Sequence, residues 1–246
     1  MKIHFLGTMG WFDSELGNTL CVLVDTEKAY IVFDAGGGFY KLDRYIKENK
    51  PVILLFSHFH LDHISGLHAL AKFSFPQGIK VFGPPGVKKL FSTLINDPYS
   101  MPVKQLKTRL TINEFSPRSK LPVEIESRRL RHVGVCYGYR ITAENKRLAF
   151  CTDTGPCKNF EALAAGADVL ITECSLPPGK VDNRWPHLNP QQAAVIAKKA
   201  KVKQLFLAHF DSGAYPRLTE IKKAERSARV IFKRTRVARD GLTVKI

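Results

Sequence analysis

The sequence lacks any hydrophobic run long enough to cross a membrane. Its longest apolar stretches, such as 51–56 and 205–208, fall far short of the roughly 20 residues that a bilayer-spanning helix needs. The first residues lead directly into a strand-like pattern, without the apolar segment and cleavage site of a secretory signal peptide. We therefore expect a protein that is not inserted in a membrane and that resides in the cytoplasm.

Cysteine is scarce and irregularly placed. The number of cysteines is odd and no two of them form a CxxC pair, which argues against a disulfide framework and against a cysteine-based zinc knuckle. We expect small buried side chains without a chemical role, as is usual for free cysteine. The five residues are Cys21, Cys136, Cys151, Cys157 and Cys174.

Linkers and repeats are also missing. The sequence shows no Ser/Gly-rich or Pro-rich tract, no long run of like charge and no internal repeat. With 246 residues, of which 44% are hydrophobic, the chain is long enough to bury a substantial core. These features predict a single domain over residues 1–246.

Acidic residues are outnumbered: 22 Asp and Glu stand against 38 Lys and Arg, a net charge of +16. The basic residues concentrate at 104–131, 198–203 and 226–239. Such a field captures anionic ligands, which would suit a phosphate-bearing substrate or nucleic acid. A solvated Lys/Arg surface of the kind found in hyperthermophile proteins explains it equally well, so charge alone does not choose between them.

Short apolar runs that end in polar residues and are followed by helical segments recur along the chain, which indicates the α/β class. A helix should begin at Pro190, since Asn189 is a favourable N-cap and proline is favoured at the first helical position. Strands expected over 3–6, 19–24 and 30–33 complete a mixed β-sandwich flanked by helices. Strands at 52–56, 148–151, 169–171 and 205–208 lead to His58, Asp153, Glu173 and His209 at their C-terminal tips, the sheet edge where ligands usually bind.

Three histidines and an aspartate fall within six residues, His58-Phe59-His60-Leu61-Asp62-His63. Alternate residues of an extended segment face the same side, so His58 and His60 can bind one metal ion, and the following turn brings Asp62 and His63 to a second. Nitrogen and oxygen ligands without thiolate suit Zn²⁺ best, and Mn²⁺ or Fe also fit. We read His4, which lies inside the first expected strand, and His68, which follows the motif, as structural.

This motif resembles the HxHxDH signature of the metallo-β-lactamase superfamily, and the resemblance extends from the opening strand and 34–36 to His209. It implies a four-layer αββα sandwich and a pair of divalent metal ions that activate water for hydrolysis. His132, Asp153 and His209 correspond to the third histidine, the bridging carboxylate and the last ligand of that family. The implied ligands are His58, His60, His132 and Asp153 on one metal, and Asp62, His63, Asp153 and His209 on the other.

Segments 152–157, 167–175 and 187–194 resemble the ribonuclease Z branch and its small phosphodiesterase relatives. In that branch a Glu–His couple, here Glu173 and His187, protonates the leaving oxygen, which departs poorly from a phosphodiester otherwise. The alternative is that Glu173 caps a backbone amide and His187 lies in a surface loop. Arg129, Arg131 and Arg184 are candidates for binding phosphate, and Trp185 for stacking on a base.

Ribonuclease Z carries a flexible arm that clamps tRNA between the positions of His132 and Asp153, but only twenty residues separate them here. We therefore expect a phosphodiesterase for a small phosphodiester, such as a cyclic nucleotide, another cyclic phosphate or a short RNA or DNA end, in which Asp62 helps to position the attacking water. The alternatives are a carboxyl-ester, thioester or lactone hydrolase on the same metal site, and a tRNA 3′-processing endoribonuclease. A homodimer is plausible. The segment 96–122 is expected to be a loop that either covers the site or forms a subunit contact.

Overall fold

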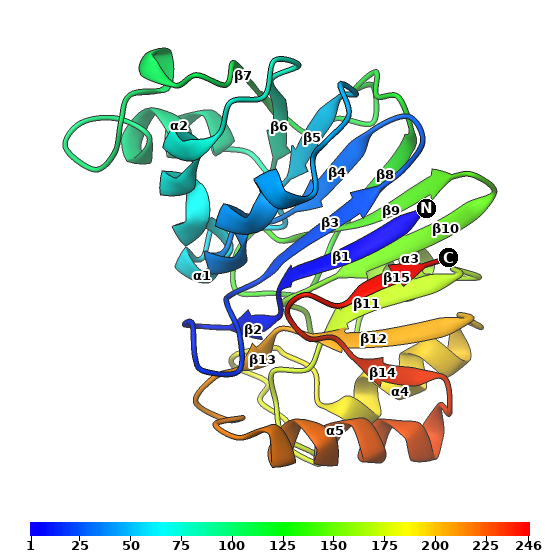
Figure 1. The fold of residues 1–246 in the computed structure, drawn as a ribbon. Coiled ribbons are helices and arrows are strands. Elements are labelled where there is room, and N and C mark those ends of the chain that lie inside the picture. The colour runs from blue at the N-terminus through cyan, green and yellow to red at the C-terminus, as the bar shows by residue number, and fades with distance from the viewer.

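The computed structural model describes residues 1–246 and contains two large β-sheets packed face to face between layers of helices (Figure 1). The first sheet has the order β15 (Thr243–Lys245), β1 (Lys2–Gly7), β3 (Cys21–Asp25), β4 (Tyr30–Phe33), β5 (Val52–Leu55), β6 (Ile79–Gly83) and β7 (Leu110–Glu114). The second has the order β14 (Thr235–Val237), β12 (Gln204–Ala208), β11 (Val169–Glu173), β10 (Lys146–Cys151), β9 (Tyr137–Ala143) and β8 (Glu124–Arg129). A short pair, β2 (Met9–Gly10) and β13 (Phe210–Asp211), lies beside them.

The helices cover the outer faces of the two sheets. The first sheet is covered by η1 (Gly37–Arg44), α1 (Leu61–Ile64), η2 (Ser65–Lys72) and α2 (Val87–Leu94), with a single turn η3 (Val103–Gln105) nearby. The second is covered by α3 (Lys158–Ala164), α4 (Pro190–Lys199) and α5 (Leu218–Ile231), the last two visible below it in Figure 1. The predicted four-layer αββα sandwich is confirmed.

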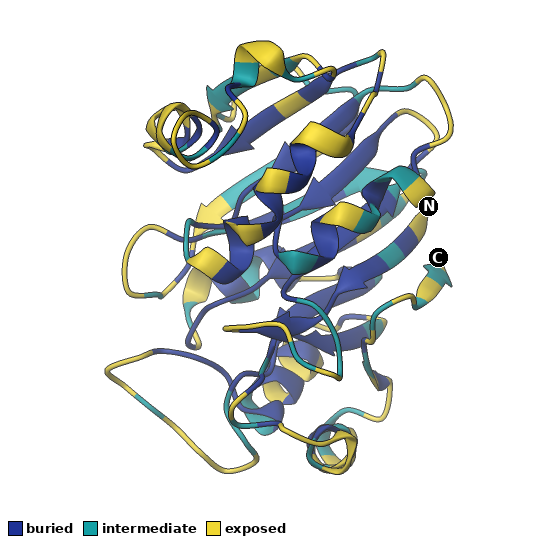
Figure 2. Ribbon diagram, turned by 60° about the vertical axis from the view of Figure 1, so that its left-hand side comes forward, coloured by how far each residue is buried: buried dark blue, intermediate teal, exposed yellow.

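Central strands are apolar on both faces because each face meets a separate hydrophobic cluster. In β5, Val52 and Leu54 pack towards the helices, whereas Ile53 and Leu55 face the other sheet. Between the sheets, Phe33 stacks on Phe150 with ring centroids 4.4 Å apart. Figure 2 shows the resulting pattern, with strands largely buried and helices exposed only on their outer sides.

The parallel strands of both sheets end at one edge. Strands β4, β5, β6 and β7 run parallel in the first sheet, as do β10, β11, β12 and β14 in the second. Asp34 and His58 follow β4 and β5, while Asp153 and His209 follow β10 and β12. The predicted strands agree with the structure to within two residues at each end, so the tips that carry these side chains meet.

The helix start predicted at Asn189 is confirmed in detail. The Asn189 side chain accepts a hydrogen bond from the backbone of Gln192, and the Gln192 side chain accepts one from the backbone of Asn189. This reciprocal capping box satisfies two of the amide groups left free at a helix start. It fixes the end of the loop that carries His187.

A two-residue turn joins β9 to β10. Its residues Glu144 and Asn145 have φ angles of 54° and 56°, as a type I′ hairpin requires. The connection between His132 and Asp153 therefore consists of two strands and a tight turn, as predicted, and contains no arm.

The expectation of a loop throughout 96–122 is wrong, because 110–114 forms the edge strand β7 and 103–105 forms η3. Leu110 and Ile112 pack on the helix-side core, and this alternation stabilises a strand that the basic and proline residues around it obscured. Among the cysteines, all but the half-buried Cys157 are buried, and none forms a disulfide. None of the helices combines the length and apolar character needed to span a bilayer.

Candidate metal centre

The edge where the parallel strands end contains a cavity of about 320 Å³. His60, Asp62, Asp153, His187 and His209 line it. They come from the loop after β5, helix α1, the ends of β10 and β12, and the loop before α4. Residues separated by up to 149 positions in the sequence therefore face one space.

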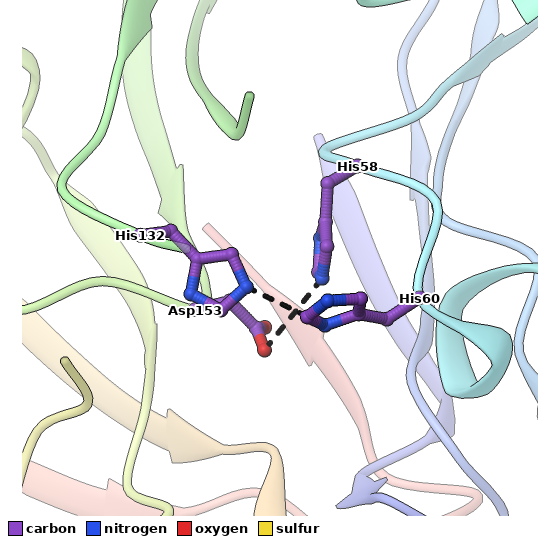
Figure 3. A group of neighbouring side chains, drawn as sticks. All are labelled: His58, His60, His132 and Asp153. Atoms are coloured by element: carbon purple, nitrogen blue, oxygen red, sulfur yellow. Dashed lines mark hydrogen bonds and ion pairs between the residues drawn. The ribbon is translucent and has the colours of Figure 1, made fainter. Parts of the chain in front are cut away.

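The first group of candidate ligands is His58, His60, His132 and Asp153 (Figure 3). The His132 Nε2 and His60 Nδ1 atoms are 3.4 Å apart, and His58 Nε2 is 3.9 Å from Asp153 Oδ2. His58 Nε2 is buried and has no hydrogen-bond partner. A buried polar atom without a partner is costly, and a cation among these donors removes that cost.

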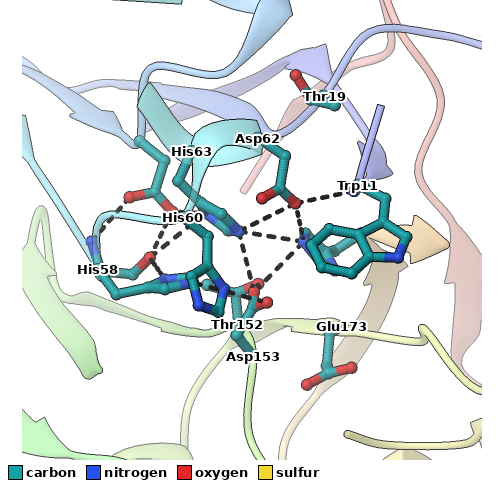
Figure 4. A network of polar contacts seen from close by, with 12 residues as sticks. Trp11, Thr19, His58, His60, Asp62, His63, Thr152, Asp153 and Glu173 are labelled. Atoms are coloured by element: carbon teal, nitrogen blue, oxygen red, sulfur yellow. Dashed lines mark hydrogen bonds and ion pairs between the residues drawn. The ribbon is translucent and has the colours of Figure 1, made fainter. Parts of the chain in front are cut away.

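The second group comprises Asp62, His63 and His209. Figure 4 shows Asp62 and His63 with Asp153 beside them. The His63 Nε2 atom is 3.1 Å from His209 Nε2 and 3.2 Å from Asp153 Oδ1, and His209 Nε2 is 3.1 Å from Asp62 Oδ2. Tetrahedral ligands at zinc distances are about 3.3 Å from one another. The donor atoms of the second group therefore already have the spacing that a divalent metal ion requires.

Two of these residues, Asp153 and His209, adopt left-handed backbone conformations, with φ of 47° and 49°. Asp34, after β4, has φ of 57°. Such conformations cost on the order of 1–3 kcal/mol each for residues other than glycine and persist where the surrounding structure enforces them. The strained turns direct three side chains from strand tips into the centre.

A layer of hydrogen bonds behind the ligands orients them. The fully buried Asp34 carboxylate faces His63 Nδ1 at 2.9 Å and accepts from the backbone and hydroxyl of Ser57, each at 2.7 Å. Ser175 Oγ lies 3.0 Å from His209 Nδ1. Partners of this kind fix the ring orientation of metal-binding histidines. Sequence analysis missed both roles, although Asp34 follows a strand directly, as the other site residues do.

Glycine at position 10 is required by a close approach to His209. A Cβ atom at Gly10 would lie 2.6 Å from Cε1 of the His209 ring. Next to it, the backbone amide of Trp11 donates to Asp62 Oδ2 over 2.8 Å. The segment after β1 therefore supports two candidate ligands, which the sequence alone did not indicate.

Burial and neighbouring charges shift the pKa values of the histidines in opposite directions. Burial and the proximity of His63 hold the pKa of His58 well below its usual value, so its ring is neutral and able to coordinate a cation. Burial also opposes the charged form of His63, but the carboxylates of Asp153, Asp62 and Asp34 outweigh it and hold the pKa of His63 well above its usual value. Metal binding at the second group must therefore displace a proton.

Glu173 and His187 form a buried pair at the side of the cavity. His187 Nδ1 lies 2.9 Å from both carboxylate oxygens of Glu173, which also accepts from the backbone amide of Leu188. Glu173 thus caps backbone amides and contacts His187 as well, and His187 is buried rather than in an open surface loop. Burial opposes the charged form of His187, but the Glu173 carboxylate outweighs it and raises the pKa of His187 to about 9.

The four predicted substrate contacts separate into two kinds. Trp185 lines the cavity, and its ring lies parallel to that of His60 with centroids 5.9 Å apart. Arg129, Arg131 and Arg184 are exposed, and none of them lines the cavity. Their contact with phosphate stays a prediction.

The chain is similar to known proteins over its whole length. The family model for the beta-lactamase superfamily domain matches residues 29–210. Ribonuclease Z of Bacillus velezensis is 25% identical over 310 aligned positions, which cover 100% of this chain and 99% of that protein. The alignment is longer than this chain, so that relative has segments without a counterpart here.

Two solved structures share the fold. The metallo-beta-lactamase fold protein YhfI of Bacillus subtilis has a TM-score of 0.83 and 23% identity, covering 99% of this chain and 98% of that one. The short form of human tRNase Z has a TM-score of 0.77 and 20% identity, covering 100% and 99%. Both likenesses extend over nearly the whole chain and therefore over both sheets.

Proposed function

The chain belongs to the beta-lactamase superfamily, and on this premise we propose that it is a metal-dependent phosphodiesterase that hydrolyses a small phosphodiester. The observation that carries the proposal is the buried Glu173–His187 pair beside the histidine and aspartate groups. A thioester or an aryl ester, whose leaving group departs without protonation, has no need of such a pair, whereas a phosphodiester that expels an alkoxide needs a proton donor.

Two divalent metal ions, most suitably zinc with manganese or iron as alternatives, fit the donor set. When bound, they supply the Lewis acidity that activates water and offsets the charge of the phosphate. We assign His58, His60, His132 and Asp153 to one ion, and Asp62, His63 and His209, with Asp153 shared, to the other.

The proton donor follows from the geometry of His187. Its Nδ1 atom faces Glu173, so Nε2, on the opposite side of the ring, is available to a substrate in the cavity. Water adds to phosphorus and releases one proton to solvent, the bond from phosphorus to the leaving oxygen breaks, and that oxygen takes the Nε2 proton, which solvent later replaces. Glu173 then holds the neutral ring with its remaining proton on Nδ1, while Asp62 helps to position the water.

A tRNA 3′-processing endoribonuclease is the second candidate, favoured by the full-length similarity to ribonuclease Z. The two-residue turn between β9 and β10 leaves no arm to clamp a tRNA body, which favours the smaller substrate. An anionic, phosphate-containing substrate also suits the net charge of +16. A homodimer and a cytoplasmic location remain predictions.

The test compares leaving groups. Metal-analysed protein is assayed on adenosine 2′,3′-cyclic phosphate, on bis(p-nitrophenyl) phosphate, on a p-nitrophenyl carboxylate ester and on a lactone, with His187→Ala and with His68→Ala as the control. His68 is exposed and lies on η2, away from the cavity.

We expect phosphodiester cleavage that requires metal. His187→Ala should reduce cleavage of the alkoxide-releasing cyclic phosphate by about 10²- to 10⁴-fold and cleavage of the nitrophenyl diester much less, because nitrophenolate leaves without protonation. Ester or lactone turnover that is indifferent to His187, without phosphodiester cleavage, would overturn the proposal in favour of a carboxyl-ester, thioester or lactone hydrolase. Cleavage of precursor tRNA alone would favour the endoribonuclease.

A further inference from the structure

Both tryptophans of the chain lie at the same cavity. The chain has two tryptophans, Trp11 and Trp185. Both line the cavity, and their ring centroids are 6.2 Å apart. Trp11 is 55% exposed and Trp185 37%, so both rings remain accessible at the mouth. The two rings are tilted by 39° to each other, and each offers a face on which an aromatic base can stack.

Trp11 is held in place at an energetic cost. Its φ angle of 71° is in the left-handed region, which is unfavourable for a bulky residue. Its backbone amide donates to Asp62 Oδ2, and further along the segment the Asp13 carboxylate accepts from the backbone of Thr19. The Trp11 and Trp185 rings form the aromatic wall of the cavity, and the backbone that carries Trp11 is fixed and joined directly to a candidate metal ligand.

The charges around the wall are acidic. No lysine or arginine lines the cavity, whereas Asp182 and Asp211 do, in addition to the aspartates of the metal centre. Oδ1 of Asp182 accepts from the backbone amides of Arg184 and Trp185, and Oδ1 of Asp211 accepts from that of Gly213. Oδ2 of each carboxylate accepts no hydrogen bond from the protein, so both are available to donors on a ligand.

We propose that the non-reacting part of the substrate is a nucleoside, with its base on the Trp11 and Trp185 wall and its hydroxyl or amino groups donating to Asp182 and Asp211. The inference rests on the proposed function, which places the reacting phosphate on the metal ions. A second phosphate in the cavity would meet the Asp182 and Asp211 carboxylates, and no lysine or arginine lines it. The nearest cation to these two, Arg184, lies 3.9 Å from Asp182 Oδ1 with its side chain 95% exposed to solvent, so the substrate carries a single phosphate inside the cavity. The substrate class is a nucleoside cyclic phosphate rather than an oligonucleotide.

The first experiment compares adenosine 2′,3′-cyclic phosphate with glycerol 1,2-cyclic phosphate, which has the same reacting ring and no nucleoside. The variants are Trp11→Leu and Trp185→Leu, with Phe12→Leu as the control, since Phe12 is 54% exposed and does not line the cavity. Each tryptophan variant should lower kcat/KM for the adenosine compound by about 5- to 100-fold, leaving the glycerol compound and the Phe12 variant little changed. An equal loss on both compounds, or no loss on either, would overturn the inference.

Tryptophan fluorescence provides a measurement that does not depend on turnover. Because both tryptophans border the cavity, adenosine monophosphate should quench the emission of the metal-loaded protein, and glycerol phosphate should bind at least 5-fold more weakly. Quenching by the nucleotide in a protein that cleaves no phosphodiester would support the proposed base-binding site and refute the proposed function. Phosphodiester cleavage by a protein that binds adenosine monophosphate and glycerol phosphate with equal affinity would support the proposed function and refute the base-binding site.

The substitution Asp182→Asn tests the role of the acidic residues at the cavity. Asparagine retains an acceptor for the amides of Arg184 and Trp185 but removes the negative charge. The parent should prefer adenosine 2′,3′-cyclic phosphate over a trinucleotide that ends in the same cyclic phosphate, and the variant should narrow that preference. An unchanged ratio, or a parent that prefers the trinucleotide, would contradict the proposed exclusion of a second phosphate.

Discussion

Replacement of Asp34 by asparagine should weaken metal binding without a change in any candidate ligand. The buried carboxylate contacts two donors of Ser57 and Nδ1 of His63, all within 2.9 Å. Asparagine offers one acceptor oxygen and turns an amide nitrogen towards at least one of these groups. The His63 ring then loses the partner that fixes its proton on Nδ1 and its lone pair on Nε2.

The magnitude follows from measured losses of such partners. Removing a hydrogen-bonded group behind a metal ligand lowers metal affinity by about 10- to 100-fold. At about 1.4 kcal/mol per factor of ten, this is about 1.4–2.8 kcal/mol of binding free energy. The metal-free protein should also lose stability, since a hydrogen bond to a charged group contributes about 1.5–3 kcal/mol.

The assay is a competition titration for zinc against a chromophoric chelator at neutral pH, with urea denaturation of the metal-free proteins in parallel. Asp168→Asn is the control, because Asp168 accepts from the backbone of Arg147 and pairs with Lys203 outside the cavity. It should lose some stability and keep its zinc affinity. If Asp34→Asn were destabilised but bound zinc as tightly as the parent, the orienting role would be refuted and Asp34 would be a structural carboxylate.

Three further substitutions test other parts of the structure. Gly10→Ala should reduce zinc affinity in the same titration, because its Cβ would clash with the His209 ring. Unchanged affinity would show that the backbone around Gly10 can shift to accommodate the Cβ. Phe33→Ala should lower the free energy of unfolding by about 3–5 kcal/mol, measured in urea, because it leaves a cavity between the sheets. In the metal-free protein, pairing with Glu173 raises the folded pKa of His187 from 6.5 to about 9. The stabilisation of the folded state by this pair is therefore complete below pH 6.5 and is lost as pH rises through about 9. The stability difference between the parent and His187→Gln, followed by urea denaturation across this range, should therefore shrink as pH rises, and a constant difference would contradict the electrostatic pairing.

The sequence predicted the elements that depend on local patterns. Apolar runs such as 52–56 located the strands, Asn189 and Pro190 located a helix start, and the histidine cluster at 58–63 located the centre. In these cases the signal lies within a few residues, since side-chain alternation, capping and clustered ligands are local properties. The pairing of Glu173 with His187 was also predicted, because the resemblance to the ribonuclease Z branch implied it.

The parts that sequence analysis missed depend on contacts between distant segments. Nothing near Trp11 in the sequence indicates that its amide contacts Asp62, or that its ring lies beside Trp185. Charge along the sequence did not locate the cavity lining either: Arg129 and Arg131, close to His132 in the sequence, do not line the cavity, whereas Asp182 and Asp211 do. Local composition does not specify which side chains the fold brings to a common surface.

The left-handed turns at Asp34, Asp153 and His209 have a consequence for directed evolution. At each of these positions the residue that suits the backbone best is glycine or asparagine, and neither supplies the carboxylate or imidazole that the centre uses there. Selection for thermal stability alone should therefore enrich these two residues at the three positions and erode metal affinity. A library screened for activity after heating should instead retain the parental residues and gain its stability elsewhere.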